Sequence, residues 1–179
     1  MNRSRAEHDV YRIVRSGLWR DLEFRSLSRL VPSGQGLLLY LLTGHDGRSV
    51  PGLYVVWRDA MAAALGWSAE NVQRHLDELV ASGWVTRDDE VGLLWIPSAF
   101  ACNLPTSTSA ALSWGRMARR LPESHVLCNA AQRIEELLEE GRSSAFLEAW
   151  RRGYRNSRVA NTPVNPAVNS DEKTTGARA

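Results

Sequence analysis

The chain has 179 residues, 44% of them apolar, and a formal net charge of +2 at pH 7. This length and apolar content suffice for one sizeable core, so folding needs no disulfide or metal. The N-terminus MNRSRAEHDV lacks the apolar stretch of a secretory signal, and the richest apolar run, GLLLYLLTG, is too short to span a bilayer. Cys102 and Cys128 are too far apart for a CxxC pair, and we expect both to be buried in a reducing compartment. A secreted scaffold and a membrane protein are therefore excluded, and a cytoplasmic protein is expected.

Charge is distributed unevenly along the chain. Residues 1–30 hold seven Arg against four acids, and residues 142–179 hold seven Arg or Lys against three acids. The centre, residues 31–141, holds eight basic and thirteen acidic residues. Arginine suits bidentate contacts with phosphate and guanine, although a GC-rich genome would also produce an Arg-rich chain. The basic ends thus favour a nucleic-acid partner, and the acidic centre opposes one.

The first elements are weakly patterned. Residues 10–19 alternate loosely and predict a short strand, and residues 21–30 predict a turn or short helix. After the break at Pro32 to Gly34, the leucine-rich segment 36–43 predicts a buried helix. Residues 53–57, LYVVW, predict a short strand.

Two helices joined by a tight turn are predicted next. The first begins at Arg58 and ends at Gly66, where a left-handed conformation costs glycine little. Ser68 caps the second, which runs to residue 82. Its apolar residues recur at helical spacing on one face: Val72, Leu76, Leu79 and Val80.

The C-terminal half predicts a hairpin and two further helices. WVTR and VGLLWIP are two β-prone runs separated by the acidic turn 88–90. Residues 122–141 have a continuous apolar face and predict a helix, and residues 143–154 predict a shorter amphipathic one. From residue 156 onward the chain is rich in Asn, Pro, Ser and Thr, so we expect a disordered tail.

A helix, a tight turn, a second helix and a hairpin together form a winged helix-turn-helix. The predicted fold class is therefore α+β and mainly helical, with C-terminal helices following this motif. The predicted organisation is an Arg-rich arm or strand (1–25), a winged helix-turn-helix domain (26–121), a helical segment (122–155) and the tail (156–179).

The outward face of the second helix is the candidate DNA-binding surface. A helical wheel places six polar residues there: Glu70, Asn71, Gln73, Arg74, Asp77 and Glu78. Asn, Gln and Arg match the donor and acceptor patterns of adenine and guanine edges. The residues expected to contact bases or nearby phosphates are Ser68, Asn71, Gln73 and Arg74. Those expected to contact the phosphate backbone are Arg48, Arg58 and Arg87.

The surroundings of this face are acidic. Residues 53–98 hold three Arg against seven acids, whereas phosphate neutralisation supplies most non-specific DNA affinity. Either the Arg-rich ends fold beside the motif and contact phosphates, or the motif is a protein-binding platform without DNA binding.

The sequence also resembles a known family, the phage replication-initiation proteins, or replisome organisers, which are similar to primosomal DnaD-type proteins. The resemblance covers residues 18–127 and rests on LWRDLEFRSLS, GLLLYLLTG, GLYVVW, LGWSAENVQRHLDELVASGWV, LLWIP, the Asn and Pro of NLP, and LPES. It implies binding to origin or primosome duplex DNA in a bacterial or phage-infected cell, and recruitment of a helicase or helicase loader. A longer helicase-recruiting domain is not expected in this chain. The alternative is a transcriptional regulator, a homodimer formed through residues 122–140.

No catalytic motif is recognisable, so we expect a non-enzymatic protein without cofactor or metal. The phosphate loop GxxxxGK[ST] and the HExxH and GxSxG motifs are absent. The four histidines, His75 among them, have no metal-ligand spacing, and we expect each to be solvated or half-buried. The carboxylates at 88–90 are expected to be a solvated turn rather than nuclease ligands. Among the tryptophans, Trp57, Trp67, Trp84 and Trp95 are assigned to the core or its margin. Trp114 and Trp150 remain candidates for contacts with nucleic acid or a partner.

Overall fold

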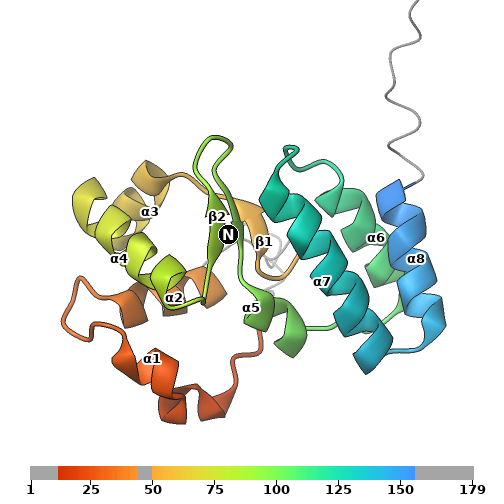
Figure 1. Ribbon diagram of the computed structural model, residues 1–179, viewed down its shortest axis with the longest axis horizontal. Helices are drawn as coiled ribbons and strands as arrows, with labels where there is room; N and C mark the ends of the chain where they lie inside the picture. The colour runs from red at the N-terminus through yellow and green to blue at the C-terminus, as the bar shows by residue number, and fades with distance from the viewer. Residues whose placement is uncertain (1–11, 44–49, 156–179) are drawn as a thin grey trace, which may run out of the picture.

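The computed structural model describes residues 12–43 and 50–155 (Figure 1). Most of the described chain is helical, and one small antiparallel sheet lies between two groups of helices. This arrangement agrees with the predicted α+β, mainly helical class. The predicted tail 156–179 lies outside the described residues.

The N-terminal region forms three helices: the 3-10 helix η1 (Ser16–Arg20), α1 (Leu22–Ser26) and α2 (Gly34–Thr43). Among the described residues of segment 10–19 there is no strand, so the predicted strand is wrong there. Leu18 and Phe24 are buried, and the Asp21 carboxylate accepts a hydrogen bond from Phe24 N–H at 3.0 Å. Burial of these two side chains and this N-cap favour short helices over an extended segment.

The centre of the chain closely follows the prediction. It contains β1 (Leu53–Val55), α3 (Arg58–Leu65), α4 (Ala69–Ala81), β2 (Thr86–Asp88) and β3 (Leu93–Trp95). The sheet order is β1-β3-β2, and both pairs are antiparallel. Trp95 on β3 lies opposite Leu53 on one side and Thr86 on the other.

Four helices follow: α5 (Pro97–Cys102), α6 (Thr108–Ala118), α7 (His125–Gly141) and α8 (Ser144–Arg155). Helices α5 and α6 were not predicted from the sequence. Ser107 caps α6 by accepting a hydrogen bond from Ala110 N–H at 3.1 Å, and Gly115 lies inside that helix. Gly115 and Gly153 allow α6 and α8 to pack closely, because a Cβ on either would collide with the backbone of the other helix. Since α6 packs along α8, this contact crosses the predicted boundary at residue 121.

The sheet separates two hydrophobic cores, one on each face. Leu94 and Ile96 belong to the core formed with η1, α1, α2, α3 and α4. Leu93 and Trp95 belong to the core formed with α5, α6, α7 and α8. Successive strand residues point to opposite faces, so β3 is buried on both sides. The hairpin is therefore covered by α7 on one face (Figure 1).

Helix α7 is buried along its apolar face within the same chain. The buried residues are Val126, Leu127, Ala130, Ala131, Ile134 and Leu138. This face packs against the sheet and α8, and so it does not support dimerisation through residues 122–140.

In the described ranges, no helix is long and apolar enough to cross a membrane.

Candidate nucleic-acid interface

The α3–α4 turn has the geometry that its sequence predicts. Gly66 adopts a left-handed conformation with φ of 67°, and Trp67 N–H donates to Ala62 O at 3.0 Å. The Ser68 hydroxyl accepts a hydrogen bond from Asn71 N–H at 3.2 Å and caps α4. Ser68 was predicted to contact DNA, and its oxygen is already engaged in this cap.

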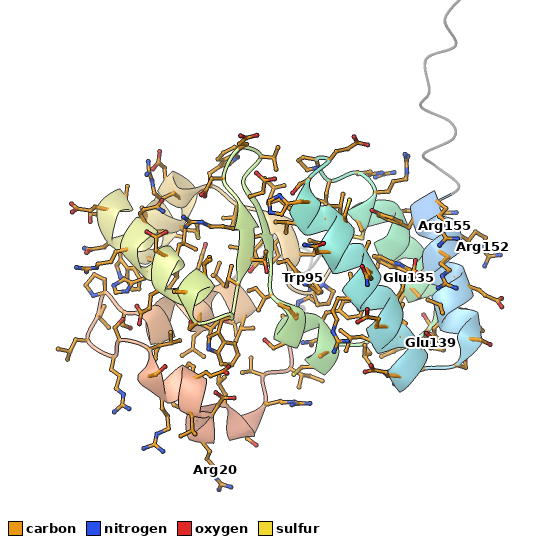
Figure 2. All side chains as sticks on the ribbon, in the orientation of Figure 1. Arg20, Trp95, Glu135, Glu139, Arg152 and Arg155 are labelled. Atoms are coloured by element: carbon orange, nitrogen blue, oxygen red, sulfur yellow. The ribbon has the colours of Figure 1, made fainter. Side chains whose placement is uncertain are left out.

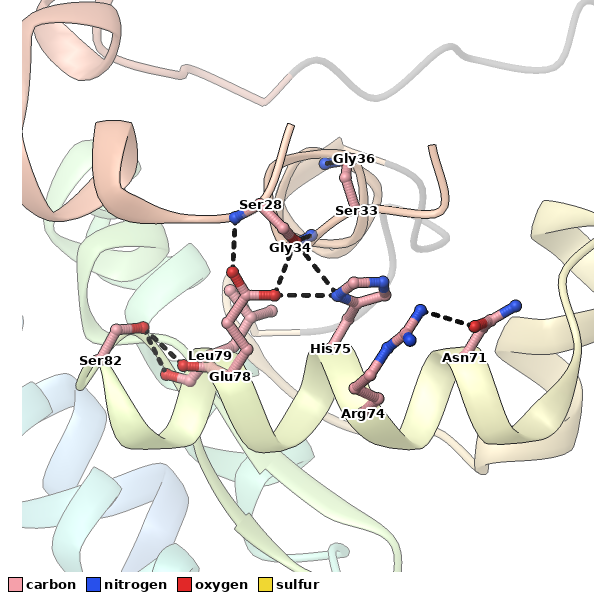
Figure 3. Close-up of polar contacts among 10 residues, drawn as sticks. All are labelled: Ser28, Ser33, Gly34, Gly36, Asn71, Arg74, His75, Glu78, Leu79 and Ser82. Atoms are coloured by element: carbon pink, nitrogen blue, oxygen red, sulfur yellow. Dashed lines mark hydrogen bonds and ion pairs between the residues drawn. The ribbon is translucent and has the colours of Figure 1, made fainter. Parts of the chain in front are cut away.

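The solvent face of α4 carries part of the predicted set. Glu70, Arg74 and Asp77 are exposed, whereas Asn71 and Gln73 are half-buried. Arg74 Nη2 donates to Asn71 Oδ1 at 2.7 Å, so these two side chains are oriented together (Figure 3).

Asp77 holds two of the other candidate residues on the side of α4 nearer the hairpin. Its Oδ1 accepts hydrogen bonds from Gln73 Nε2 at 3.0 Å and from Arg87 Nη2 at 2.7 Å. Arg87 also approaches Asp89 Oδ1 through Nε at 3.2 Å, and only 15% of its side chain is exposed. Gln73, Arg87 and Asp89 line a cleft of about 440 Å³ between α3, α4 and the hairpin. Arg87 is thus neutralised by carboxylates and poorly placed to contact phosphate.

The opposite side of α4 is fixed to the N-terminal segment by Ser28, His75 and Glu78 (Figure 3). Glu78 accepts hydrogen bonds from Ser28 N–H at 2.5 Å and from Ser28 Oγ at 2.8 Å. Its Oε2 also lies 2.8 Å from His75 Nδ1. The Ser28 hydroxyl in turn accepts a hydrogen bond from Gly34 N–H at 2.7 Å. The network therefore joins α4 to the segment that connects α1 with α2.

This network corrects two predictions. Glu78 was placed on the outward face, but only 27% of its side chain is exposed. His75 was expected to be solvated or half-buried, but it is 4% exposed and packs edge-on against Trp67. The network was not predicted from the sequence, because Ser28 lies 50 residues from Glu78 in the chain.

The charge state of Glu78 follows from these contacts. Burial raises its pKa, but hydrogen bonds from Ser28 and His75 outweigh burial, so its pKa lies below the ordinary value. Since the Ser28 hydroxyl proton points to Glu78, His75 Nδ1 carries the proton that bonds Glu78. Ser28 and Glu78 both approach Nδ1, whereas a Ser-His-acid relay needs them at opposite ring nitrogens. The three residues therefore act as a structural clip.

The hairpin tip is acidic and partly tied to α7. Asp88 Oδ2 lies 3.5 Å from His125 Nδ1, and a hydrogen bond with Ser124 lowers the pKa of Asp88. Asp88 also accepts a hydrogen bond from Glu90 N–H at 3.1 Å within the turn. Negative charge and attachment to α7 make this tip a poor ligand for a DNA groove.

Arg58 and Arg48 are the other two residues predicted to contact phosphate. Arg58 Nε lies 3.3 Å from Asp59 Oδ1, and half of the Arg58 side chain is exposed. Arg48 lies outside the described residues.

Tryptophan and cysteine positions also differ from expectation. Trp150 is fully buried and Trp114 is half-buried, packed 5.8 Å from the Phe100 ring, so neither is an open contact surface. The exposed tryptophans are Trp19 and Trp57, at 63% and 54%. The apolar pattern assigned Trp57 to the core or its margin, but it is exposed. Cys102 is half-buried and Cys128 exposed, so the prediction of two buried thiols is wrong for Cys128.

Two exposed arginines lie within three residues of Ser28, which joins the segment between α1 and α2 to α4. Arg25 and Arg29 flank Ser28, which is hydrogen-bonded to Glu78, and both are exposed. Neither forms an ion pair with any residue in 12–43 or 50–155. Arg20, on η1, projects into solvent (Figure 2). The Arg-rich composition of residues 1–30 predicted a basic region here, but it could not show which arginines are exposed.

The candidate surface for a polyanion is the exposed face of α4 together with the exposed arginines on either side of Ser28, which form no ion pair in the described residues; Arg29 donates a hydrogen bond to Arg25 O at 2.9 Å. In the described part of the chain, no group of His, Cys, Asp or Glu side chains could hold a metal ion. Comparison of the chain with models of protein families, with curated proteins and with solved structures finds no match.

Proposed function

We propose that α3, α4 and the β2–β3 hairpin form a winged helix-turn-helix that binds duplex DNA through α4. In this proposal, Asn71 and Arg74 contact base edges, and Arg25 and Arg29 contact phosphates. The observation that carries it is the clip from Ser28 to Glu78 and His75, which anchors the Arg-bearing segment beside α4. Glu78, which holds Ser28, lies four residues from Arg74, or about one helical turn. One duplex can therefore reach Arg74 and the arginines on either side of Ser28.

The hairpin has a lesser part in this proposal than the sequence suggests. Arg87 and Gln73 are bonded to Asp77, and the tip carries Asp89 and Glu90. Contacts from the N-terminal segment therefore replace those of a basic wing. The resemblance to phage replication-initiation proteins supports origin DNA as the ligand and a helicase or its loader as a protein partner.

The proposal is tested by fluorescence anisotropy with a labelled duplex that contains the chain's cognate site, selected from random sequences. Arg74→Ala should weaken binding by about 1–3 kcal/mol if the guanidinium contacts a base. Arg116→Ala, an exposed arginine on α6, is the matched control and should bind as the wild type does. Equal affinities of Arg74→Ala and wild type would refute the role assigned to α4.

A protein-binding adaptor is the second candidate, and the acidic hairpin side of α4 favours it. Asp77, Asp89 and Glu90 there would repel phosphate and attract a basic partner surface. The selection experiment separates the two candidates, because an adaptor enriches no duplex above background.

A further inference from the structure

The loop that connects α1 with α2 is closed at its base by hydrogen bonds. Ser28 O accepts a hydrogen bond from Gln35 N–H at 3.2 Å, and Ser28 Oγ accepts one from Gly34 N–H at 2.7 Å. We call the residues between these ends, 29–33, the α1–α2 loop. Figure 1 shows it as the orange loop that projects from the left edge of the molecule. Because both of its ends are held, the loop loses little conformational freedom when a ligand covers it.

Two large apolar side chains are exposed at the tip of the α1–α2 loop. Leu30 is 88% exposed and Val31 is 77% exposed. In residues 12–43 and 50–155, no other large apolar side chain is as exposed as Leu30. Neither side chain belongs to a core, and the hydrophobic effect favours a ligand that removes both from water. The loop therefore presents an apolar tip on a restrained base.

The base of the α1–α2 loop is fixed to α4. Ser28 N–H and Ser28 Oγ–H both donate to the Glu78 carboxylate (Figure 3). Leu30 follows Ser28 by two residues, which span at most about 7 Å. Arg74 lies about one helical turn from Glu78, so the tip lies within roughly 20 Å of Arg74. Neighbouring grooves of B-DNA are half a turn, or about 17 Å, apart along the axis. A duplex with α4 in its major groove therefore has a minor groove within reach of the loop.

Positive charge lies beside the loop. Arg25 and Arg29 are exposed, and neither forms an ion pair in the described part of the chain. Arg29 Nη2 donates a hydrogen bond to Arg25 O at 2.9 Å, which holds its guanidinium at the end of α1. Glu23 is exposed on α1 and offsets one of these two charges. An apolar tip beside cations matches a ligand with an anionic backbone and an apolar interior. A DNA duplex has this chemistry, because phosphates line its grooves and stacked bases lie between them.

We propose that the α1–α2 loop enters the minor groove beside the major groove that α4 occupies, and that Leu30 and Val31 insert between two base pairs and bend the duplex. Leucine and similar apolar side chains act as such wedges in minor-groove binders, with bends of about 20–90°. Arg29 contacts a phosphate at the edge of this groove. Pyrimidine–purine steps unstack most easily, so the wedge selects a TA or CA step. The inference rests on the proposed function of α4 and adds DNA deformation to it.

The test is resonance energy transfer between fluorophores at the two ends of a duplex of about 30 base pairs that carries the site selected from random sequences. Saturation with the full wild-type chain should raise the transfer efficiency, because a bend brings the ends together. Leu30→Ser/Val31→Ser, at saturation on the same duplex, should leave the efficiency at that of free DNA. Leu22→Ser is the matched control and should bend the duplex as the wild type does, because this leucine of α1 is 78% exposed but lies outside the loop.

The outcomes separate the wedge from the function of α4. If the wild type binds the duplex but leaves it straight, or if the double variant bends it equally, the wedge is refuted while duplex binding by α4 stands. If the wild type enriches no duplex at all, the proposed function fails and the wedge fails with it. If DNA stays straight and the wild type, but not the double variant, binds phosphatidylglycerol vesicles, the loop tip contacts a lipid surface and the proposal is overturned.

Discussion

Replacement of Glu78 by alanine is the sharpest test of the clip between α4 and the N-terminal segment. The variant removes the acceptor for Ser28 N–H and Ser28 Oγ–H and the partner of His75 Nδ1. A hydrogen bond to a charged group contributes about 1.5–3 kcal/mol. These contacts are not additive and Glu78 is 27% exposed, so we expect a total loss of about 2–3 kcal/mol.

Thermal and urea unfolding followed by circular dichroism measure this loss. For a chain of this size, the expected fall in Tm is roughly 5–10 °C. Glu148→Ala, an exposed glutamate on α8, is the matched control and should change stability by no more than about 0.5 kcal/mol. If Glu78→Ala unfolds within that same margin of the wild type, Glu78 does not anchor the N-terminal segment.

Further predictions concern pH, glycine and charge. The pKa of Glu78 is lowered in the folded protein, so the stabilisation from its carboxylate is present above the ordinary pKa of 4.5 and is lost as pH falls through the folded pKa. The difference in unfolding free energy between wild type and Glu78→Gln should therefore shrink in urea titrations below pH 4.5. Gly66→Ala should cost about 1 kcal/mol because of its positive φ, whereas Gly17→Ala, in open space, should be nearly neutral by the same assay. Gly115→Ala should destabilise by about 1–3 kcal/mol by forcing α6 from α8, and a cost below that of Gly17→Ala would contradict their close packing. Asp77→Ala should tighten duplex binding in anisotropy titrations by roughly threefold to tenfold, since it removes one of the two carboxylates that bind Arg87 and so removes a negative charge; weaker binding would contradict this role.

Local patterns predicted the elements that depend on local chemistry. The α3–α4 turn follows from Gly66 and the Ser68 cap, and α4 and α7 follow from apolar residues at helical spacing. Strand boundaries were close for the same reason, because the turn at 89–92 is built by nearby residues.

Features that depend on distant residues were not predicted. The burial of Glu78 and His75 requires Ser28, and the pairing of Arg87 requires Asp77 on a different element. Helix α6 is short and contains Gly115. A glycine is needed there because the backbone of α8 lies close by. For the site, composition predicted basic ends that compensate for an acidic centre, but only the fold distinguishes paired arginines from exposed ones.

The fold also changes how the role of the N-terminal arginines should be tested. Deletion of residues 1–25 would remove Leu18 and Phe24 from the core, and loss of binding would then report unfolding. Substitution of exposed arginines avoids this ambiguity.

The most direct measurement is the salt dependence of duplex binding by the wild type and by Arg25→Gln/Arg29→Gln, with Arg116→Gln as control. Each phosphate contact contributes about 0.9 to the slope of log affinity against log salt concentration. We predict steep salt dependence for the wild type and for the control, and a slope lower by about two for the double variant. A double variant with the wild-type affinity and slope would contradict the composite surface of α4 and the N-terminal segment.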